Sequence, residues 1–193
     1  MPFPARISTR LCRDGQDARA PSMKNRRIVI VGFMGCGKST VAQALARNLA
    51  CKAIDLDSFI TEQEGRSPAQ IIEQDGEAAF RQIETQALRE ALGNSAARVL
   101  ALGGGAWTIT ANRNLISDHD CLSVWLDAPF EICWERILSS ADTIRPMAPD
   151  RESAERLYLS RRASYELASL RVQPGDDALG EIIRAIESLP GPL

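Results

Sequence analysis

The chain has 193 residues, of which 45% are hydrophobic and 25% charged, and its formal net charge is −2 at pH 7. These values are typical of one globular domain with one buried core, and no apolar run approaches the roughly 20 residues needed to cross a bilayer. Seven basic residues lie within the first 27. The remainder is therefore acidic, which disfavours a large nucleic-acid-binding surface. The five scattered cysteines lack metal-ligand or redox-pair spacing and predict reduced thiols in the cytoplasm.

Residues 1–26 contain several prolines and arginines but no apolar stretch of a secretory signal. We expect a disordered tail there, and a single domain over residues 27–189. Met23 stands just ahead of the first predicted strand and is a candidate translation start. An organelle transit peptide is the alternative interpretation, which the lack of an amphipathic stretch disfavours.

The segment Gly-Phe-Met-Gly-Cys-Gly-Lys-Ser-Thr at 32–40 directly follows the apolar run 28–31 and matches the P-loop pattern. In a P-loop, backbone N–H groups and the positive end of the next helix surround a phosphate chain. We expect Lys38 to neutralise the outer phosphates and Ser39 to ligate Mg²⁺. A glycine-rich turn that only links two elements is the alternative. The predicted nucleotide-binding residues are Gly35, Cys36, Gly37, Lys38, Ser39 and Thr40.

Strand and helix patterns alternate along the rest of the chain. Val41, Leu45 and Leu49 share one helix face, and residues 179–189 form a closing amphipathic pattern. Buried strands are predicted at 27–31, 53–56, 98–102, 121–126 and 170–173. Five strands separated by helices predict an α/β fold with a parallel five-stranded sheet flanked by helices on both faces. Ligands of such sheets bind at the carboxyl ends of the strands.

Two segments are unusual for a simple βαβ fold: a long helical insert and an irregular loop. Residues 58–92 read as helices broken at Gly65 and near Gly76, with a capping box at 67–70 restarting the helix. One helix suffices for a crossover, so this insert predicts a helical substrate-binding flap. Residues 139–151 hold two prolines without periodicity and predict a mobile lid that excludes water. A plain surface loop is the alternative.

Asp55 and Asp57 lie at the end of the second predicted strand. Their i, i+2 spacing on an extended chain directs both side chains to one side, toward the phosphates. We expect Asp55 to hold a water bound to Mg²⁺, and Asp57 to orient the attacking hydroxyl and accept its proton. The alternative role for Asp57 is a helix N-cap.

The third predicted strand ends in Leu-Gly-Gly-Gly at 102–105 and has no acidic residue there that could interact with Mg²⁺. The metal-binding role is therefore assigned to Asp55. Consecutive glycines allow a ligand to approach the backbone closely, although a tight turn is the other interpretation.

These motifs continue to the carboxyl-terminal half, where they include Ile144-Arg145-Pro146 and Arg161-Arg162-Ala163-Ser164-Tyr165. Together with Gly76–Glu84, they make the chain over residues 27–188 resemble the shikimate kinase family. The resemblance implies a nucleoside monophosphate kinase-like fold and a monomer. It also implies ATP-dependent phosphorylation of the 3-hydroxyl of shikimate, with Mg²⁺, in aromatic amino acid biosynthesis.

The resemblance also implies residue roles. Arg81 and Arg162 would grip the substrate carboxylate, with Glu84 positioning Arg81, although the residues alone indicate a solvated i, i+3 ion pair. Gly103, Gly104 and Gly105 would line the substrate pocket. Arg145 would swing from the lid over the transferring phosphoryl group as a catalytic and ATP-binding residue, beside Lys38. Arg136 is a candidate for stacking on adenine.

The chain departs from the family pattern in three places. Met147 and Ala148 follow the lid Arg-Pro where two leucines are usual, Ser164 replaces a common proline, and the lid has few glycines. These changes bear on substrate affinity more than on chemistry. Two alternatives remain open: another P-loop kinase acting on gluconate or a nucleoside monophosphate, and a non-catalytic ATP-binding module.

Overall fold

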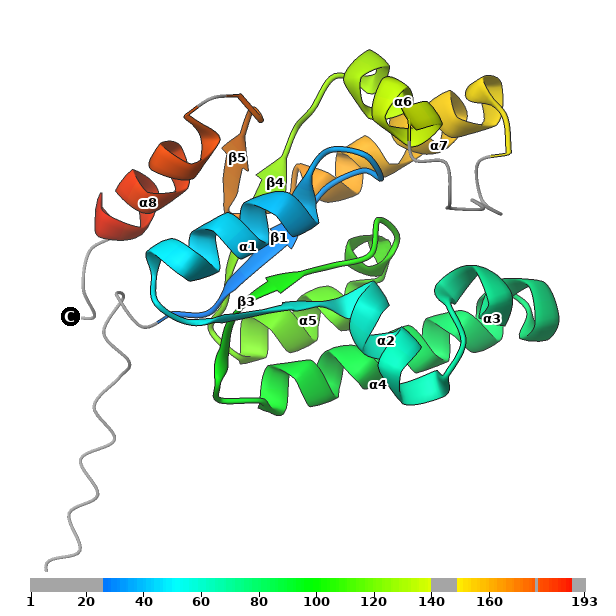
Figure 1. Ribbon diagram of the computed structural model, residues 1–193, viewed down its shortest axis with the longest axis horizontal. Helices are drawn as coiled ribbons and strands as arrows, with labels where there is room; N and C mark the ends of the chain where they lie inside the picture. Colours follow the sequence, from blue (N-terminus) through cyan, green and yellow to red (C-terminus); the bar gives the residue numbers. More distant parts are fainter. Residues whose placement is uncertain (1–25, 140–148, 176, 189–193) are drawn as a thin grey trace, which may run out of the picture.

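The computed structural model describes residues 26–139, 149–175 and 177–188 (Figure 1). Five strands form one parallel sheet in the order β2-β3-β1-β4-β5. This confirms the predicted α/β class and the five-stranded parallel sheet, and every strand end lies within one residue of its predicted position. The strands are β1 (Ile28–Val31), β2 (Lys52–Asp55), β3 (Ala97–Ala101), β4 (Leu122–Leu126) and β5 (Leu170–Val172).

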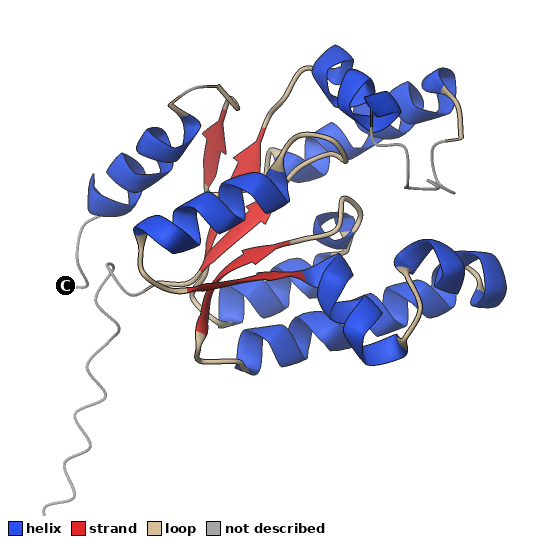
Figure 2. Ribbon diagram, viewed as in Figure 1, coloured by secondary structure: helices blue, strands red, loops and turns tan. Residues whose placement is uncertain are grey.

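Helices cover both faces of the sheet, as predicted (Figure 2). The helices α1 (Lys38–Asn48) and α8 (Ala178–Ser188) contact each other over one face, and α4 (Glu77–Gly93) and α5 (Thr110–Asp118) contact each other over the opposite face. The remaining helices are α2 (Leu56–Glu64), α3 (Pro68–Asp75), the 3-10 helix η2 (Ala106–Thr108), α6 (Phe130–Ser139) and α7 (Arg151–Tyr165). No helix in the described part of the chain is long and apolar enough to span a membrane.

The central strand β1 fixes the place of the P-loop. All four of its residues are at most 1% exposed, because β3 and β4 pair with it on either side and helices cover both faces. Ile30 lies opposite Ala101 of β3 and Val124 of β4. Since the three strands are parallel and in register, the segments that follow them leave the sheet at the same edge.

The predicted helical insert is present as α2, α3 and α4. Gly65 ends α2 with a positive φ of 65°. Ser67 and Gln70 form the predicted capping box, in which the Gln70 side chain accepts from Ser67 N at 2.8 Å and Ser67 Oγ accepts from Gln70 N at 3.3 Å. The insert begins earlier than predicted, because α2 starts at Leu56.

This early start corrects the prediction for Asp57. The chain is not extended there, since Asp57 lies in the first turn of α2. Asp55 is the N-cap instead, and its Oδ1 accepts from the backbone N–H groups of Asp57 at 3.1 Å and Ser58 at 3.2 Å. A carboxylate at a strand end stabilises the unpaired N–H groups of the next helix, so the strand turns into helix one residue after Asp55.

The predicted lid at 139–151 is described only at its two ends. Ser139 is the last residue of α6, and Arg151 is the first residue of α7, whose N-cap Asp150 accepts from Ser153 N at 2.7 Å. Residues 140–148, which include Arg145, lie outside the described residues, as do residues 1–25 of the predicted tail.

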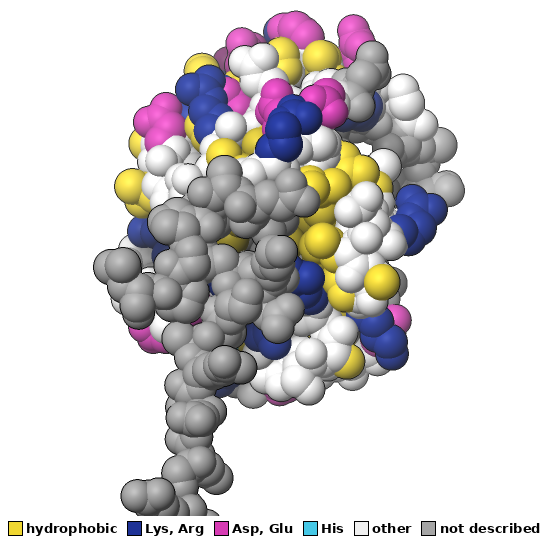
Figure 3. Space-filling view, turned by 90° about the vertical axis from the view of Figure 1, so that its left-hand side faces the viewer, with side chains coloured by type: hydrophobic (Ala, Val, Ile, Leu, Met, Phe, Trp, Pro, Cys, Tyr) yellow, Lys and Arg dark blue, Asp and Glu magenta, His cyan; other side chains and the backbone are white. Residues whose placement is uncertain are grey.

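Arg27 connects neighbouring elements at the other end of the sheet, where the strands begin. It precedes β1, and its guanidinium donates to the carbonyl oxygens of Ala97 at 3.1 Å and Asn94 at 3.1 Å, and to that of Leu92. One side chain thereby satisfies carbonyl groups at the end of α4 and the start of β3. Basic and acidic side chains are interspersed on this side of the molecule (Figure 3).

We predict that Arg27→Met lowers the free energy of unfolding by about 2 kcal/mol, because it leaves partly buried carbonyl groups without a donor. Chemical denaturation measures this change. Arg89→Met is the matched control, since Arg89 is exposed on α4 and, among the described residues, donates only to Gln86 one turn earlier. Equal stability of the two variants would contradict the role of Arg27.

Candidate active site

A cavity of about 860 Å³ opens at the carboxyl ends of the strands. The P-loop, the ends of β2 and β3, and residues of α3, α4, α6 and α7 line it. Of the six predicted P-loop residues, all but Cys36 line the cavity. The Cys36 side chain is buried, and its backbone N–H donates to Phe33 O at 3.3 Å.

The P-loop backbone requires glycine at positions 35 and 37. Gly37 is the N-cap of α1 with φ 98°, and Gly35 has φ 77°, both in a region that side chains disfavour. A methyl group on Gly35 would also overlap the Cys133 carbonyl of α6. Because Gly37 has no side chain that could cap α1, the first N–H groups of the helix are left for an anion in the cavity.

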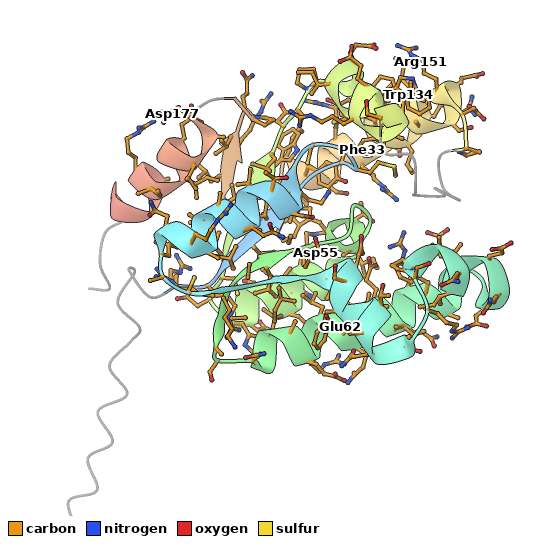
Figure 4. All side chains as sticks on the ribbon, in the orientation of Figure 1. Phe33, Asp55, Glu62, Trp134, Arg151 and Asp177 are labelled. Atoms are coloured by element: carbon orange, nitrogen blue, oxygen red, sulfur yellow. The ribbon has the colours of Figure 1, made fainter. Side chains whose placement is uncertain are left out.

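Oxygen ligands suited to Mg²⁺ lie beside this anion site. The Ser39 hydroxyl donates to Oδ2 of Asp55, which stands at the end of β2 (Figure 4). Hydroxyl and carboxylate oxygens are the hard ligands that Mg²⁺ prefers, and phosphates and water usually complete its shell. The residues present therefore fit Mg²⁺ bound together with a phosphate ligand.

Two cations border the P-loop. Lys38 folds over the loop and its Nζ donates to Phe33 O at 2.9 Å. Arg136 approaches from α6, where its Nη1 donates to Gly35 O at 3.4 Å. Both side chains line the cavity, so positive charge lies on two sides of the space above the loop.

The glycine-rich segment after β3 is surrounded by charged side chains. A methyl group on Gly103 would lie 2.6 Å from Oδ1 of Asp57, and one on Gly105 would lie 2.6 Å from Nη1 of Arg81. A methyl group on Gly104 would lie 3.2 Å from Nη1 of Arg161. None of the three has a positive φ. Glycine is needed here because functional side chains pass against the backbone, and not because of backbone strain.

Arg81 is held by two carboxylates. Its guanidinium lies 2.7 Å from Glu84 and 3.0 Å from Glu77. Glu84 is 1% exposed, so the pair is buried at one end and is not the solvated helix pair that spacing alone indicates. Burial raises the pKa of Glu84, with Arg81 acting in the opposite direction. The second oxygen of Glu84, Oε1, has no hydrogen-bond partner among the described residues.

Arg161 lines the cavity beside the same glycine-rich segment as Arg81. It is 7% exposed, and no carboxylate of the described residues lies within ion-pair distance of it. Burial lowers its pKa, and its interaction with the Tyr165 hydroxyl acts in the opposite direction. A buried guanidinium without a carboxylate partner is costly unless a ligand supplies the negative charge.

Arg162, which was predicted to bind the substrate carboxylate, does not line the cavity. Its Nη1 donates to Oδ1 of Asp127 at 2.9 Å and to the Tyr158 hydroxyl at 2.8 Å, and its guanidinium lies over the Trp125 ring. Asp127 is 7% exposed and also binds Arg171. Arg162 is therefore paired with Asp127 outside the cavity, and not at the predicted binding site for the substrate carboxylate.

Helical spacing could have identified Arg161. The buried residues of α7 are Ala154, Tyr158, Arg161 and Tyr165, which recur at intervals of four, three and four. This is the spacing of one buried helix face, so residue 161 points inward and residue 162 turns away by about 100°. The spacing of Arg161 from the buried Tyr158 and Tyr165 is the signal that could have placed Arg161, and not Arg162, on the inward face of the helix.

The chain is similar to known proteins over most of its length. The family model of shikimate kinase matches residues 34–188. The shikimate kinase of Enterococcus faecalis is 39% identical over 162 residues, which cover 82% of this chain and 95% of that protein. The structure of shikimate kinase from Acinetobacter baumannii in complex with shikimate is 31% identical with a TM-score of 0.74, covering 84% of this chain and 90% of that one. The structure from Aquifex aeolicus is 32% identical with a TM-score of 0.69, covering 83% and 96%.

We predict a distinct pH dependence for Glu84→Gln. Because the pKa of Glu84 is raised above 4.5 by folding, the folded state holds this proton more tightly than the unfolded state. Wild type therefore loses stability relative to Glu84→Gln as the pH rises from about 4.5 through the folded pKa. Urea denaturation of both proteins between about pH 4 and pH 8 measures the difference. A gain of wild type over the variant with rising pH would contradict the assigned burial of the charge.

Proposed function

The chain belongs to the shikimate kinase family, and on this premise we propose how its own residues carry out the reaction. The reaction transfers the γ-phosphoryl group of ATP to the 3-hydroxyl of shikimate, and gives shikimate 3-phosphate and ADP in the pathway to chorismate and the aromatic amino acids. The single observation that carries the assignment of residues is the buried Arg161, which lines the cavity and forms no ion pair with a carboxylate of the described residues.

The acceptor carboxylate binds between Arg161 and Arg81 in this proposal. Both guanidinium groups line the cavity, and both lie against the glycine-rich segment. A planar guanidinium makes paired hydrogen bonds to a carboxylate, and two of them select an acid over an uncharged sugar. The ion pair with Glu84 keeps Arg81 in place. The backbone of Gly103, Gly104 and Gly105 lines the cavity, where it contacts the ring of the acceptor in this proposal.

The triphosphate of ATP lies along the P-loop in this proposal. The N–H groups at the start of α1 and the Lys38 ammonium bind the phosphates, and Ser39 with Asp55 would hold Mg²⁺. When bound, Mg²⁺ neutralises charge that develops on the phosphoryl oxygens. Arg136 is positioned to contact the nucleotide. Arg145, outside the described residues, is proposed to reach the transferring phosphoryl group from the lid.

Asp57 is proposed to orient the attacking hydroxyl. It lies in the first turn of α2, lines the same cavity as Lys38, and approaches Gly103 on the acceptor side. It therefore stands between the two halves of the site. With a loose transition state, a carboxylate here acts by aligning the hydroxyl and accepting its proton late in the transfer.

We further propose that the chain acts as a cytoplasmic monomer with one kinase domain over residues 27–189. The expectation rests on the family, which the match over residues 34–188 shows.

The direct test is ADP release from Mg²⁺-ATP with shikimate, gluconate, AMP or no acceptor. We predict release that depends on shikimate. Asp57→Asn should lower turnover by about 10²–10⁴-fold while nucleotide affinity is kept, because an amide aligns the hydroxyl poorly and cannot take its proton. Calorimetry with a non-hydrolysable ATP analogue measures the affinity. Release with another acceptor, or near-normal turnover of the variant, would contradict the proposal.

Neighbouring arginines of α7 allow a matched comparison. Arg161→Lys should raise the KM for shikimate at least about tenfold, because lysine cannot make the paired contact to a carboxylate. Arg162→Lys should change it less than about twofold, since Arg162 binds Asp127 outside the cavity. Steady-state kinetics at saturating ATP measure both. The reverse order of effects would restore the original assignment to Arg162.

A further inference from the structure

One hydroxyl joins the two walls of the acceptor site. Tyr165 is 1% exposed, and its hydroxyl donates to Gly104 O at 2.5 Å. The Arg161 guanidinium, which starts one helical turn earlier on α7, lies against the same glycine, since a methyl group on Gly104 would lie 3.2 Å from its Nη1, and its interaction with the Tyr165 hydroxyl is favourable. A phenol can donate one hydrogen bond and accept others, so Tyr165 binds the glycine-rich segment and the guanidinium at once.

The surroundings hold the Tyr165 ring in place. It stacks on Trp125 of β4 with ring centroids 6.0 Å apart and planes 26° apart. Beside it, Trp107 of η2 donates from Nε1 to Ser164 O at 2.8 Å. The end of α7 and the segment after β3 are therefore joined by two hydrogen bonds, both within one helical turn after Arg161.

We propose that Tyr165 is a positioning residue, which fixes the Arg161 guanidinium and the Gly104 carbonyl in one geometry before the acceptor acid binds. This inference rests on the proposed function of the site. Tyr165 itself does not line the cavity, so it acts through these two groups. An ordered guanidinium binds a carboxylate more tightly, because less rotamer freedom is lost when the complex forms.

Tyr158 provides an internal control of the same chemistry. It lies seven residues earlier on the same buried face of α7, and its hydroxyl donates to Ala128 O at 3.0 Å. It also accepts from an arginine, Arg162, at 2.8 Å. Both hydroxyls thus bind a backbone carbonyl and an arginine, but only the partners of Tyr165 line the cavity.

The test compares Tyr165→Phe with Tyr158→Phe, both of which keep the ring. Tyr165→Phe should raise the Kd and the KM for shikimate about tenfold, since Arg161 and Gly104 lose a buried hydrogen bond. The KM for ATP should change less than about twofold. Tyr158→Phe should lower the melting temperature comparably but leave both shikimate constants within about twofold. Calorimetry and steady-state kinetics measure these values.

A second background separates positioning from general destabilisation. If Tyr165 acts through Arg161, Tyr165→Phe should raise the shikimate KM clearly less in the Arg161→Lys protein than in wild type. Equal increases in both backgrounds would overturn the inference, as would an unchanged shikimate KM in Tyr165→Phe or an equal increase in Tyr158→Phe. If wild type does not phosphorylate shikimate at all, the proposed function fails instead.

A measurement on the wild-type protein keeps the inference testable even if Tyr165→Phe does not fold. The chain has only two tyrosines, so labelling with ¹³Cζ-tyrosine gives two ring signals that Tyr158→Phe assigns. Titration with shikimate should shift the Tyr165 signal saturably, because the hydrogen bonds of its hydroxyl change when Arg161 takes a carboxylate. A Tyr165 signal that stays unmoved at saturating shikimate would overturn the inference.

Discussion

The burial of Arg161, with no carboxylate of the described residues within ion-pair distance, is the constraint on which the proposed acceptor site depends. A guanidinium at 7% exposure needs hydrogen-bond acceptors and a counter-charge, and among the described residues no carboxylate lies within ion-pair distance of Arg161, while Tyr165 and the more distant Glu84 stabilise its charge. The neighbouring Arg162 is neutralised by Asp127. One turn of α7 therefore contains an arginine that is paired with a carboxylate outside the cavity and an arginine that we propose binds the carboxylate of the acceptor.

The nucleotide and acceptor halves of the site share the backbone of the glycine-rich segment. A methyl group on Gly104 would lie 3.2 Å from Arg161 and 3.5 Å from the backbone nitrogen of Met34 in the P-loop. On its other side, Gly103 approaches Asp57. In the proposed function, this close approach brings the hydroxyl of the acceptor next to the terminal phosphate of ATP. Holding the two reacting groups together in this way lowers the barrier to phosphoryl transfer.

The fold and the phosphate site could be predicted because each rests on local patterns. Short stretches of sequence are enough to identify the P-loop, the alternation of strands and helices, and the capping box at Ser67. The errors came where tertiary context decides. The Asp55 carboxylate starts α2 early and moves Asp57 from strand to helix. Burial decides between two adjacent arginines, which a motif treats as equivalent but a helix separates by about 100°.

The central claim is that the acceptor supplies the negative charge that Arg161 lacks. The most direct measurement is the affinity of the wild-type protein for shikimate and for its uncharged carboxamide, determined by calorimetry with the nucleotide site saturated by ADP. The account predicts that the carboxamide binds at least about a hundredfold more weakly, because two guanidinium groups then face a neutral ligand in a buried site. Equal affinity for the two ligands would contradict it.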